Sequence, residues 1–300
     1  MPPELALLSS PDWTDYELLD SGNGCKLERF GAHIFVRPEH QAIWQQSLPE
    51  VKWQAAQAVF RAAGGDEMGG NWQSRQPIEP WEMHYKGLRF RAQLGGSRHV
   101  GVFPEQASHW DWMAGLIRTA NRPVSILNLF GYTGLATLAA AQEGARVTHV
   151  DASKKSIARA RENQALSKLD DRNIRWIVDD AMKFVLREAR RQVRYDGVIL
   201  DPPKFGRGPK GEVWECFEML PRLLESCRAI LSPQPLFVVI TAYAIRASAL
   251  SLYYAMDEMM KGTSGSIEAG ELVIVERSAG RVLSMAIYAR WGSGGLRCYI

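Results

Sequence analysis

The chain has little of what builds disulfide frameworks, metal centres or membrane spans. Its four cysteines, Cys25, Cys216, Cys227 and Cys298, form no CxxC pair. We therefore expect free thiols in a reducing compartment. None of the six histidines stands at ligand spacing from a cysteine or an acid pair, so no metal site is expected. An apolar run of about 18 residues and a basic leader segment are also missing, which predicts a cytoplasmic protein without membrane contact.

The chain does contain enough apolar material for a large core. Its 300 residues are 46% hydrophobic, which predicts one or two globular domains. The formal net charge of +3 is too small for a histone-like binder of nucleic acid. A nucleic-acid partner would have to be held by a local basic patch.

Residues 1–94 read as a small β-rich region that opens with a loose leader over 1–12. The stretch Gln41–Ala63 is predicted to be partly helical, and the pairs Gly64-Gly65 and Gly69-Gly70 to break that helix. Short apolar runs between turn residues predict strands at Tyr16–Leu19, Lys26–Phe30, His33–Val36 and Leu88–Leu94.

Tryptophan is dense in this region, at Trp44, Trp53, Trp72 and Trp81. Such rings can stack on unpaired bases of nucleic acid. They can also fill the core of a small β domain, and this interpretation is favoured for most of them.

Residues 95–300 alternate strands with helices, which is typical of a parallel sheet covered on both faces. The predicted strands are Val124–Phe130, Arg146–Asp151, Ile174–Val178, Tyr195–Asp201 and Leu236–Thr241. The predicted helices are 104–120, 133–143, 153–167, 180–192, 214–231 and 246–260. The end differs, because Glu271–Glu276 and Val282–Trp291 flank a turn and predict an antiparallel hairpin.

A glycine turn follows the first of these strands, in the sequence Gly131-Tyr132-Thr133-Gly134. Glycines allow a nucleoside to approach the backbone closely. The helix beginning near Thr133 offers unpaired N–H groups to a carboxylate. The spacing is not the dinucleotide fingerprint GxGxxG, so no pyrophosphate is expected, and a purely structural turn would read the same way.

Two acids follow the next strands. Asp151 ends its strand about 20 residues after the turn, where a carboxylate can accept both hydroxyls of a ribose. The alternative is a helix cap, a role for which Ser153 is better suited. Asp180 would hydrogen-bond an adenine amino group, but it too can be a helix cap, and Asp179 competes for either role.

The fourth strand ends in Asp201-Pro202-Pro203-Lys204-Phe205, at the sheet edge where ligands bind in open α/β folds. Two prolines fix the backbone and leave carbonyl groups as rigid acceptors. These carbonyls and the Asp201 carboxylate suit a heteroaromatic ring that bears N–H groups, and Phe205 can stack on its face.

Together, Asn128–Gly134, Asp151 and Asp201–Phe205 resemble the class I S-adenosylmethionine-dependent methyltransferases. They look most like the bacterial 23S ribosomal RNA methyltransferases of the DPPxF type, which modify cytosine C5 or guanine N7. The segment Gly101–Gln106 is similar to the family's segment in which a Phe and a Gln lie against the cofactor. The likeness covers about residues 85–291.

The resemblance implies a Rossmann-like seven-stranded sheet with a C-terminal antiparallel hairpin, the cofactor S-adenosylmethionine and an RNA substrate. The cofactor-binding residues it implies are Phe103, Gln106, Asn128, Phe130, Gly131, Tyr132, Thr133, Gly134, Asp151, Ala152, Ser153, Asp180 and Ala181. The catalytic residues would be Asp201, Pro202, Pro203 and Phe205, and the substrate-binding residues Lys204, Arg207, Lys210, Thr241 and Tyr243.

One departure from the family bears on the chemistry. The cytosine-C5 enzymes use a cysteine after the fifth strand, because attack at C6 activates C5. This chain reads Val239-Ile240-Thr241-Ala242-Tyr243 there, while Cys216 and Cys227 read as buried apolar residues of the preceding helix. Methylation of a base nitrogen, which depends on positioning, is therefore favoured.

Basic residues allow two interpretations. Arg207 and Lys210, beside Lys204, fit phosphate contact or a solvated loop equally well. Arg187, Arg190, Arg191 and Arg194 fit an exposed helix face best. The leading hypothesis is an RNA methyltransferase, with a small-molecule or protein methyltransferase as the alternative. A non-catalytic nucleic-acid-binding module is a further alternative, and a nicotinamide dehydrogenase is disfavoured because GxGxxG is absent.

Overall fold

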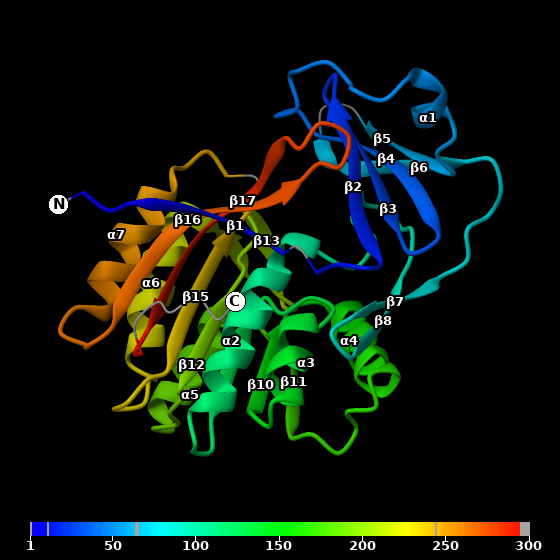
Figure 1. The fold of residues 1–300 in the computed structure, drawn as a ribbon. Helices are drawn as coiled ribbons and strands as arrows, with labels where there is room; N and C mark the ends of the chain where they lie inside the picture. The colour runs from blue at the N-terminus through cyan, green and yellow to red at the C-terminus, as the bar shows by residue number, and fades with distance from the viewer. Residues whose placement is uncertain (1, 11, 64–65, 244, 295–300) are drawn as a thin grey trace. The chain divides into compact units, whose positions relative to one another are not determined.

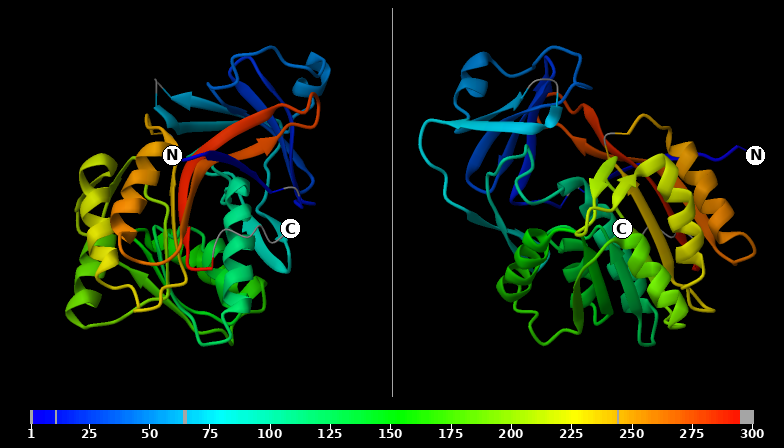
Figure 2. Two further views of the ribbon diagram at one scale, coloured as in Figure 1. Left: turned by 60° about the vertical axis from the view of Figure 1, so that its left-hand side comes forward. Right: turned by 180° about the vertical axis from the view of Figure 1, so that it is seen from behind.

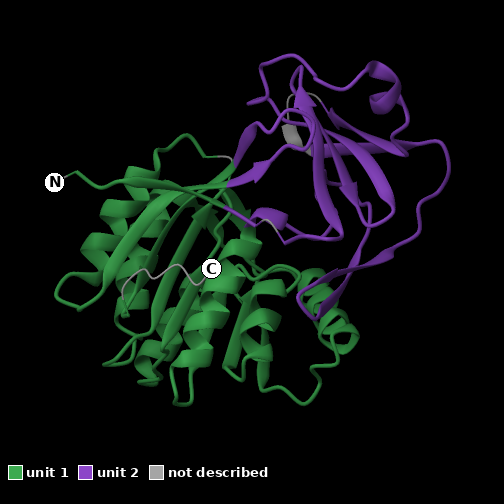
Figure 3. Ribbon diagram, viewed as in Figure 1, with its two compact units in different colours: residues 1–8, 106–272, 285–300 green, residues 9–105, 273–284 purple. Residues whose placement is uncertain are grey.

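The computed structural model describes residues 2–10, 12–63, 66–243 and 245–294. The chain divides into two compact units, each assembled from separate stretches of sequence (Figure 3). Unit 1 comprises Met1–Leu8, Gln106–Leu272 and Met285–Ile300, and unit 2 comprises Ser9–Glu105 and Val273–Ser284. The C-terminal hairpin therefore contributes residues to both units.

A large sheet forms the centre of unit 1 (Figure 1). Its strands are β1 (Leu5–Ser9), β9 (Ser125–Leu129), β10 (Arg146–Asp151), β11 (Ile174–Val178), β12 (Gly197–Leu200), β15 (Phe237–Ala242), β16 (Ser266–Val275) and β17 (Val282–Gly292). They lie in the order β1-β16-β17-β15-β12-β9-β10-β11. The strands from β15 to β11 are parallel, and β17 is antiparallel to β15. The predicted α/β fold with a terminal hairpin is confirmed.

The sheet has eight strands and not seven, because β1 forms where a loose leader over 1–12 was expected. β1 adds to the edge of β16. Gly270 of β16 makes this possible, since a Cβ atom there would lie 1.8 Å from the carbonyl oxygen of Ala6. A glycine inside a strand often marks such a close approach of two backbones.

Helices cover both faces of this sheet (Figure 2). They are α2 (Ala107–Thr119), α3 (Leu135–Gln142), α4 (Lys154–Leu166), α5 (Ala181–Arg190), α6 (Cys216–Arg228) and α7 (Ala249–Met260). α2 packs beside α3 on one face, and α6 packs between α5 and α7 on the other. Leu129, Phe184 and Ile240 are fully buried in the core between sheet and helices. In the part of the chain that is described, no helix is both long and apolar enough to span a membrane.

Unit 2 is built on a five-stranded sheet in the order β2-β3-β4-β5-β6. Its elements are β2 (Tyr16–Gly22), β3 (Cys25–Phe30), β4 (His33–Pro38), α1 (Glu50–Gln54), β5 (Ala58–Ala63), β6 (Asp66–Ser74), the hairpin strands β7 (Trp81–Tyr85) and β8 (Leu88–Ala92), and the 3₁₀ turn η1 (Pro104–Gln106) that leads into α2. β4 and β5 are parallel, and the other neighbours are antiparallel.

The helix expected in part of Gln41–Ala63 is α1 alone. Ala58–Ala63 instead forms β5, which pairs with β4 and β6. Gly70, expected to break the helix, lies within β6, where a Cβ atom would stand 2.2 Å from the carbonyl oxygen of Arg61. Pairing with two strands outweighs the local helical period, which a sequence window cannot reveal.

Three tryptophans of unit 2 donate hydrogen bonds to other residues of the same unit. The indole N–H of Trp44 donates to the carbonyl oxygen of Ser21 at 3.1 Å. Trp53, which is 7% exposed, donates to Asp20 at 3.0 Å, and Trp72 donates to the carbonyl oxygen of Ser97 at 3.0 Å. Buried indoles usually find such partners. These contacts support core packing as the role of the three side chains.

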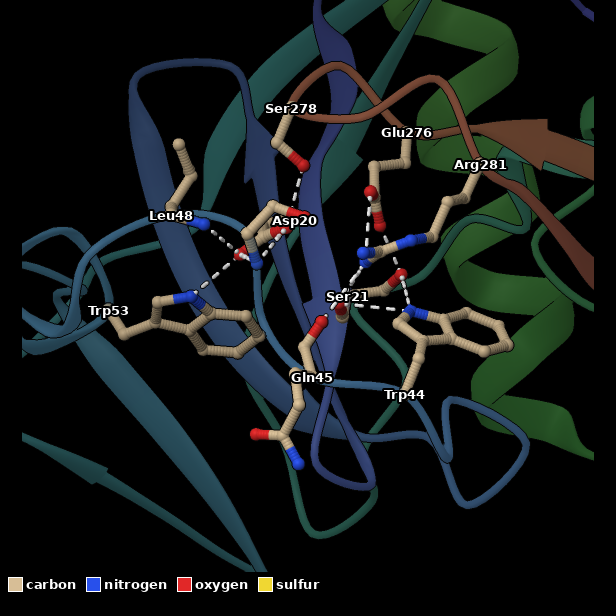
Figure 4. Close-up of polar contacts among 10 residues, drawn as sticks. Asp20, Ser21, Trp44, Gln45, Leu48, Trp53, Glu276, Ser278 and Arg281 are labelled. Carbon is tan, nitrogen blue, oxygen red and sulfur yellow. Dashed lines mark hydrogen bonds and ion pairs between the residues drawn. The ribbon is translucent and has the colours of Figure 1, made fainter.

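Asp20 ties the tip of the β16–β17 hairpin to this unit (Figure 4). Its fully buried carboxylate accepts hydrogen bonds from the Ser278 hydroxyl at 2.6 Å and the Leu48 N–H at 2.8 Å, besides the Trp53 indole. Beside it, Arg281 donates to the carbonyl oxygen of Gln45 at 3.1 Å, and the Ser21 hydroxyl bonds to Glu276.

We expect Asp20→Asn to lower the free energy of unfolding by about 2–3 kcal/mol at neutral pH, because an amide oxygen replaces a charged acceptor and an NH₂ group faces N–H donors. Burial raises the pKa of Asp20, but the hydrogen bonds from Ser278, Leu48 and Trp53 hold this pKa below the ordinary 3.8. The wild-type advantage is therefore present above pH 3.8 and is lost as pH falls through the lower, folded-state pKa. Urea unfolding across this range tests both statements.

The exposed Asp12, whose side chain is 60% accessible, provides the control. Asp12→Asn should change stability by less than about 0.5 kcal/mol. Equal effects of the two substitutions would show that the Asp20 network contributes nothing.

Candidate functional site

The loops that follow β9, β10 and β12 emerge at one edge of the unit 1 sheet. In the register of the sheet, His149 of β10 lies beside Asn128 of β9, and Leu200 of β12 lies beside Leu129. The carboxyl ends of parallel strands meet at one edge, which is where open α/β folds bind ligands. The glycine turn and Asp201 belong to these loops, and Asp151 is the last residue of β10.

The turn after β9 has an unusual backbone. Phe130 and Tyr132 have φ values of 58° and 50°, which non-glycine residues rarely adopt, and Gly134 has a φ of 86° at the start of α3. Residues held in this region cost about 1–3 kcal/mol each and cluster at ligand sites. A Cβ atom on Gly134 would also lie 2.9 Å from the Cβ atom of Ala160. The turn thus brings the amino end of α3 to the sheet edge, where N–H groups attract anions.

Three buried polar side chains, linked by hydrogen bonds, lie against this turn. The Asn128 amide donates to the Thr137 hydroxyl at 2.9 Å, and this hydroxyl lies 2.9 Å from Nδ1 of His149. Burial lowers the pKa of His149 to about 3, so its ring is neutral. A Cβ atom on Gly131 would stand only 2.3 Å from this ring. Asn128, predicted to bind cofactor, is 2% exposed and holds the turn in place.

Asp151 faces the turn as the ribose hypothesis requires. Its Oδ2 accepts the Tyr132 N–H at 2.9 Å, and its Oδ1 accepts the Ser153 N–H at 2.8 Å. Burial raises the pKa of Asp151, and these two hydrogen bonds lower it in part. Ser153, not Asp151, caps α4 by accepting the Ser156 N–H at 3.1 Å. Each carboxylate oxygen keeps a further lone pair, enough for the two hydroxyls of a ribose.

The two acids after β11 both contact α5. Asp180 is its N-cap and accepts the Lys183 N–H at 2.9 Å, while Asp179 pairs with Arg187 at 2.7 Å. The helix-cap alternative for Asp180 is thus observed, and its contact with adenine stays a prediction. The other predicted neighbours of the cofactor, Ala152, Thr133 and Ala181, are half-buried or buried.

Asp201 lies at one end of a hydrogen-bonded chain that runs through Gln106 to Thr241 of β15, all in unit 1. The Gln106 amide donates to Oδ2 of Asp201 at 3.1 Å, and the Thr241 hydroxyl donates to Oε1 of Gln106 at 3.4 Å. The structure therefore joins a predicted cofactor residue, a predicted catalytic acid and a predicted substrate residue in one chain of hydrogen bonds. Tyr243 lies half-buried beside the cluster of Leu272 and Tyr288.

Phe103, predicted to lie against the cofactor, belongs to unit 2. There its ring lies 4.7 Å from the ring of His99. Its contact with the cofactor stays a prediction.

The Pro-Pro loop runs into a small hairpin of β13 (Phe205–Arg207) and β14 (Val213–Glu215). The Trp214 indole donates to the Pro203 carbonyl at 2.7 Å, and its ring lies 4.8 Å from that of Phe130. The helix predicted from 214 begins at Cys216 instead, because Glu215 caps α6 by accepting the Glu218 N–H at 3.3 Å. Pro202 is buried, and Phe205 is 56% exposed.

The thiols fit the departure from cytosine-C5 chemistry. Cys216 and Cys227 are buried, and burial raises the pKa of both. A thiolate nucleophile needs a lowered pKa and access to solvent. The two cysteines are therefore apolar core residues, as the sequence suggested.

Basic side chains near the loop are on the surface. Lys204, Arg207 and Lys210 of this loop are exposed. Arg190, Arg191 and Arg194, which precede the other end of β12, are exposed as well. Glu212 pairs with Lys183 at 2.5 Å, and this hydrogen bond lowers the pKa of Glu212 to about 2.

Sequence reasoning missed three residues of this site, His149, Thr137 and Trp214. His149 had one signal, since it is a polar residue between the interior of its strand and Asp151, two positions further on. Trp214 had none, because it was assigned to a helix.

Comparisons with known proteins agree with this geometry. The family model for S-adenosylmethionine-dependent methyltransferases matches residues 45–252. The crystal structure of a SAM-dependent methyltransferase from Agrobacterium tumefaciens is 48% identical and covers 98% of this chain and 97% of that chain, with a TM-score of 0.92. The structure of SMU.776, a methyltransferase complexed with SAH, has a TM-score of 0.72 over 93% of this chain and 76% of that chain. At 18% identity, it supports the fold alone.

Curated relatives of the chain are named as ribosomal RNA methyltransferases. Ribosomal RNA large subunit methyltransferase I of Aeromonas salmonicida is 29% identical over 149 residues, 49% of this chain and 37% of its own length. Ribosomal RNA large subunit methyltransferase K/L of Shewanella baltica is 32% identical over 151 residues, 49% of this chain and 20% of its own length. The matches thus span a minor part of both relatives.

Proposed function

The chain belongs to the S-adenosylmethionine-dependent methyltransferase family, and from this premise we propose that it methylates a base of ribosomal RNA. The observation that supports transfer most directly is the meeting of the Gly131–Gly134 turn, Asp151 and Asp201 at one sheet edge. The names of the curated relatives support the ribosomal substrate. Such a substrate would place the reaction in the cytoplasm.

The residues of the edge fit the cofactor. The Asp151 carboxylate, which the Tyr132 and Ser153 N–H groups fix in position, would accept the ribose hydroxyls. The amino end of α3 favours the carboxylate of the methionine moiety. When bound, the cofactor supplies an electrophilic methyl group on sulfur.

Asp201 and its neighbours orient the target base. The Gln106 amide donates to Oδ2 of Asp201, and we assign the Asp201 carboxylate to an N–H of the base. The Pro203 carbonyl already accepts the Trp214 indole N–H. We therefore assign the Pro202 carbonyl as the second acceptor for the base. Phe205 would stack on the base, so that these residues together would position its nitrogen for transfer.

Nitrogen is the proposed target atom, in preference to cytosine C5. Residues 239–243 carry no cysteine, and the burial of Cys216 and Cys227 disfavours a nucleophilic thiolate. Recognition of the remaining RNA is assigned to the β-rich N-terminal region, which the sequence places at residues 1–94.

The test is transfer of tritiated methyl from S-adenosylmethionine to RNA isolated from a strain that lacks the gene. Label should appear in ribosomal RNA, and nucleoside mass spectrometry should find it on a base nitrogen. Label in protein or in a small molecule would instead identify the alternative substrate classes. No label in any fraction, or a methyl group on cytosine C5, would contradict the proposal.

A further inference from the structure

The β13–β14 hairpin has two different faces. Gly206 lies opposite Trp214, while Arg207 lies opposite Val213 and Phe205 opposite Glu215. Directly opposite residues point to the same side of an antiparallel pair, and successive residues alternate. Phe205, Arg207, Val213 and Glu215 therefore share one face, and Trp214 points away from it.

Trp214 fixes the inner face to the site. Its side chain is 4% exposed, with the N–H on the Pro203 carbonyl and the ring against Phe130. Gly206 completes this face, since a Cβ atom there would lie 3.2 Å from Cγ of Pro203. The hairpin is thus joined to both the Asp-Pro-Pro loop and the cofactor turn.

The outer face is apolar and cationic at once. Phe205 is 56% exposed and Val213 is 55% exposed. Arg207, directly opposite Val213, is also exposed. Residues 204–211 include three cations and no acid. Of the two acids in the rest of the hairpin, Glu212 is paired with Lys183, and Glu215, on the outer face, accepts the Glu218 N–H as the cap of α6. Residues 204–211 are therefore positively charged.

Resting on the proposed function, we infer that this outer face binds an unpaired RNA strand beside the target base. Beside the target base on Phe205, Val213 offers apolar contact to the face of a neighbouring base, and Arg207 and Lys210 offer cations to phosphates. In a duplex the bases are stacked and their faces are covered, so exposed apolar side chains favour an unpaired strand. The partner is a loop or bulge of RNA.

The test uses Val213→Glu, which places a negative charge on this face. Fluorescence anisotropy with a labelled, unstructured oligoribonucleotide, in the presence of S-adenosylhomocysteine, should show binding weakened at least about tenfold. Val275→Glu is the matched control, because Val275 is also a strand valine and is 51% exposed. It should bind RNA as the wild type does.

Arg207→Gln provides a second variant that does not depend on the folding of Val213→Glu. Losing one phosphate contact should reduce the slope of log affinity against log salt by about 1. Wild-type affinity and salt slope in both variants would overturn the inference, as would preference of the wild type for duplex RNA or no affinity for the unpaired strand.

The two proposals fail separately. Methyl transfer to RNA with unchanged binding in Val213→Glu and Arg207→Gln would remove the hairpin surface alone. RNA binding that depends on these residues, without transfer to any RNA, would remove the proposed reaction and keep the surface.

Discussion

Gly131→Ala should weaken binding of S-adenosylmethionine more than about 100-fold, or about 2.7 kcal/mol. The new Cβ atom would lie 2.3 Å from Cε1 and 2.6 Å from Nδ1 of His149. The ring cannot yield easily, because it is fully buried, lies 2.9 Å from the Thr137 hydroxyl and packs 4.7 Å from the ring of Trp176. The turn must therefore move, and Tyr132 and Asp151 lose their alignment. Calorimetry with purified protein measures the loss.

A second substitution tests the physical reason. His149→Ala removes the clash, so the double variant should recover cofactor affinity relative to Gly131→Ala alone. The His149→Ala single variant completes the cycle, because the lost ring leaves a cavity of its own. Gly95→Ala is the control, since a Cβ atom there meets nothing within 4 Å. The steric argument fails if the two effects are simply additive or if Gly131→Ala binds normally.

Asp201→Asn should reduce methyl transfer by about 10²–10³-fold and leave cofactor affinity unchanged. The amide keeps the shape of the carboxylate but loses the charge that accepts an N–H of the target. Its NH₂ group can also face the Gln106 amide, which donates to Asp201 in the wild type. Single-turnover rates with saturating RNA separate this loss from weaker substrate binding.

Asp196, just before the amino end of β12, is the matched control. It accepts from the Arg122 guanidinium at 2.8 Å, the Ser125 N–H at 2.9 Å and the Ser232 hydroxyl at 2.8 Å. Asp196→Asn should cost about 1–3 kcal/mol of stability and spare the transfer rate of the folded protein. If both variants lose activity only in proportion to stability, Asp201 has a structural role and the mechanism is wrong.

The sequence allowed much of this edge to be predicted, for a local reason. The glycine turn, Asp151 and Asp201 each follow a recognisable strand, and parallel strands bring their carboxyl ends together. The positions of these residues needed no knowledge of long-range packing. Their individual contacts with cofactor and substrate stay predictions.

The parts that escaped prediction depend on contacts between distant residues. Trp214 bonds to Pro203 across a turn that was assigned partly to a helix. The partly helical period of residues 41–63 hides β5, because its pairing with β6 leaves no local pattern in the sequence. Ser278 and Asp20, 258 positions apart, meet only in the folded chain. Such pairings override local propensity, and one sequence does not reveal them.

The interleaved units have a consequence for synthesis on the ribosome. Residues 9–105 emerge long before residues 273–284, which complete the same unit. A nascent chain thus holds Asp20 without Ser278, its closest hydrogen-bond donor, until the β16–β17 hairpin has been made. A premature stop before β16 would leave both units unfinished, since the other sheet would lack β16 and β17 beside β15. Newly made protein therefore reaches its native state only after this hairpin has been synthesised.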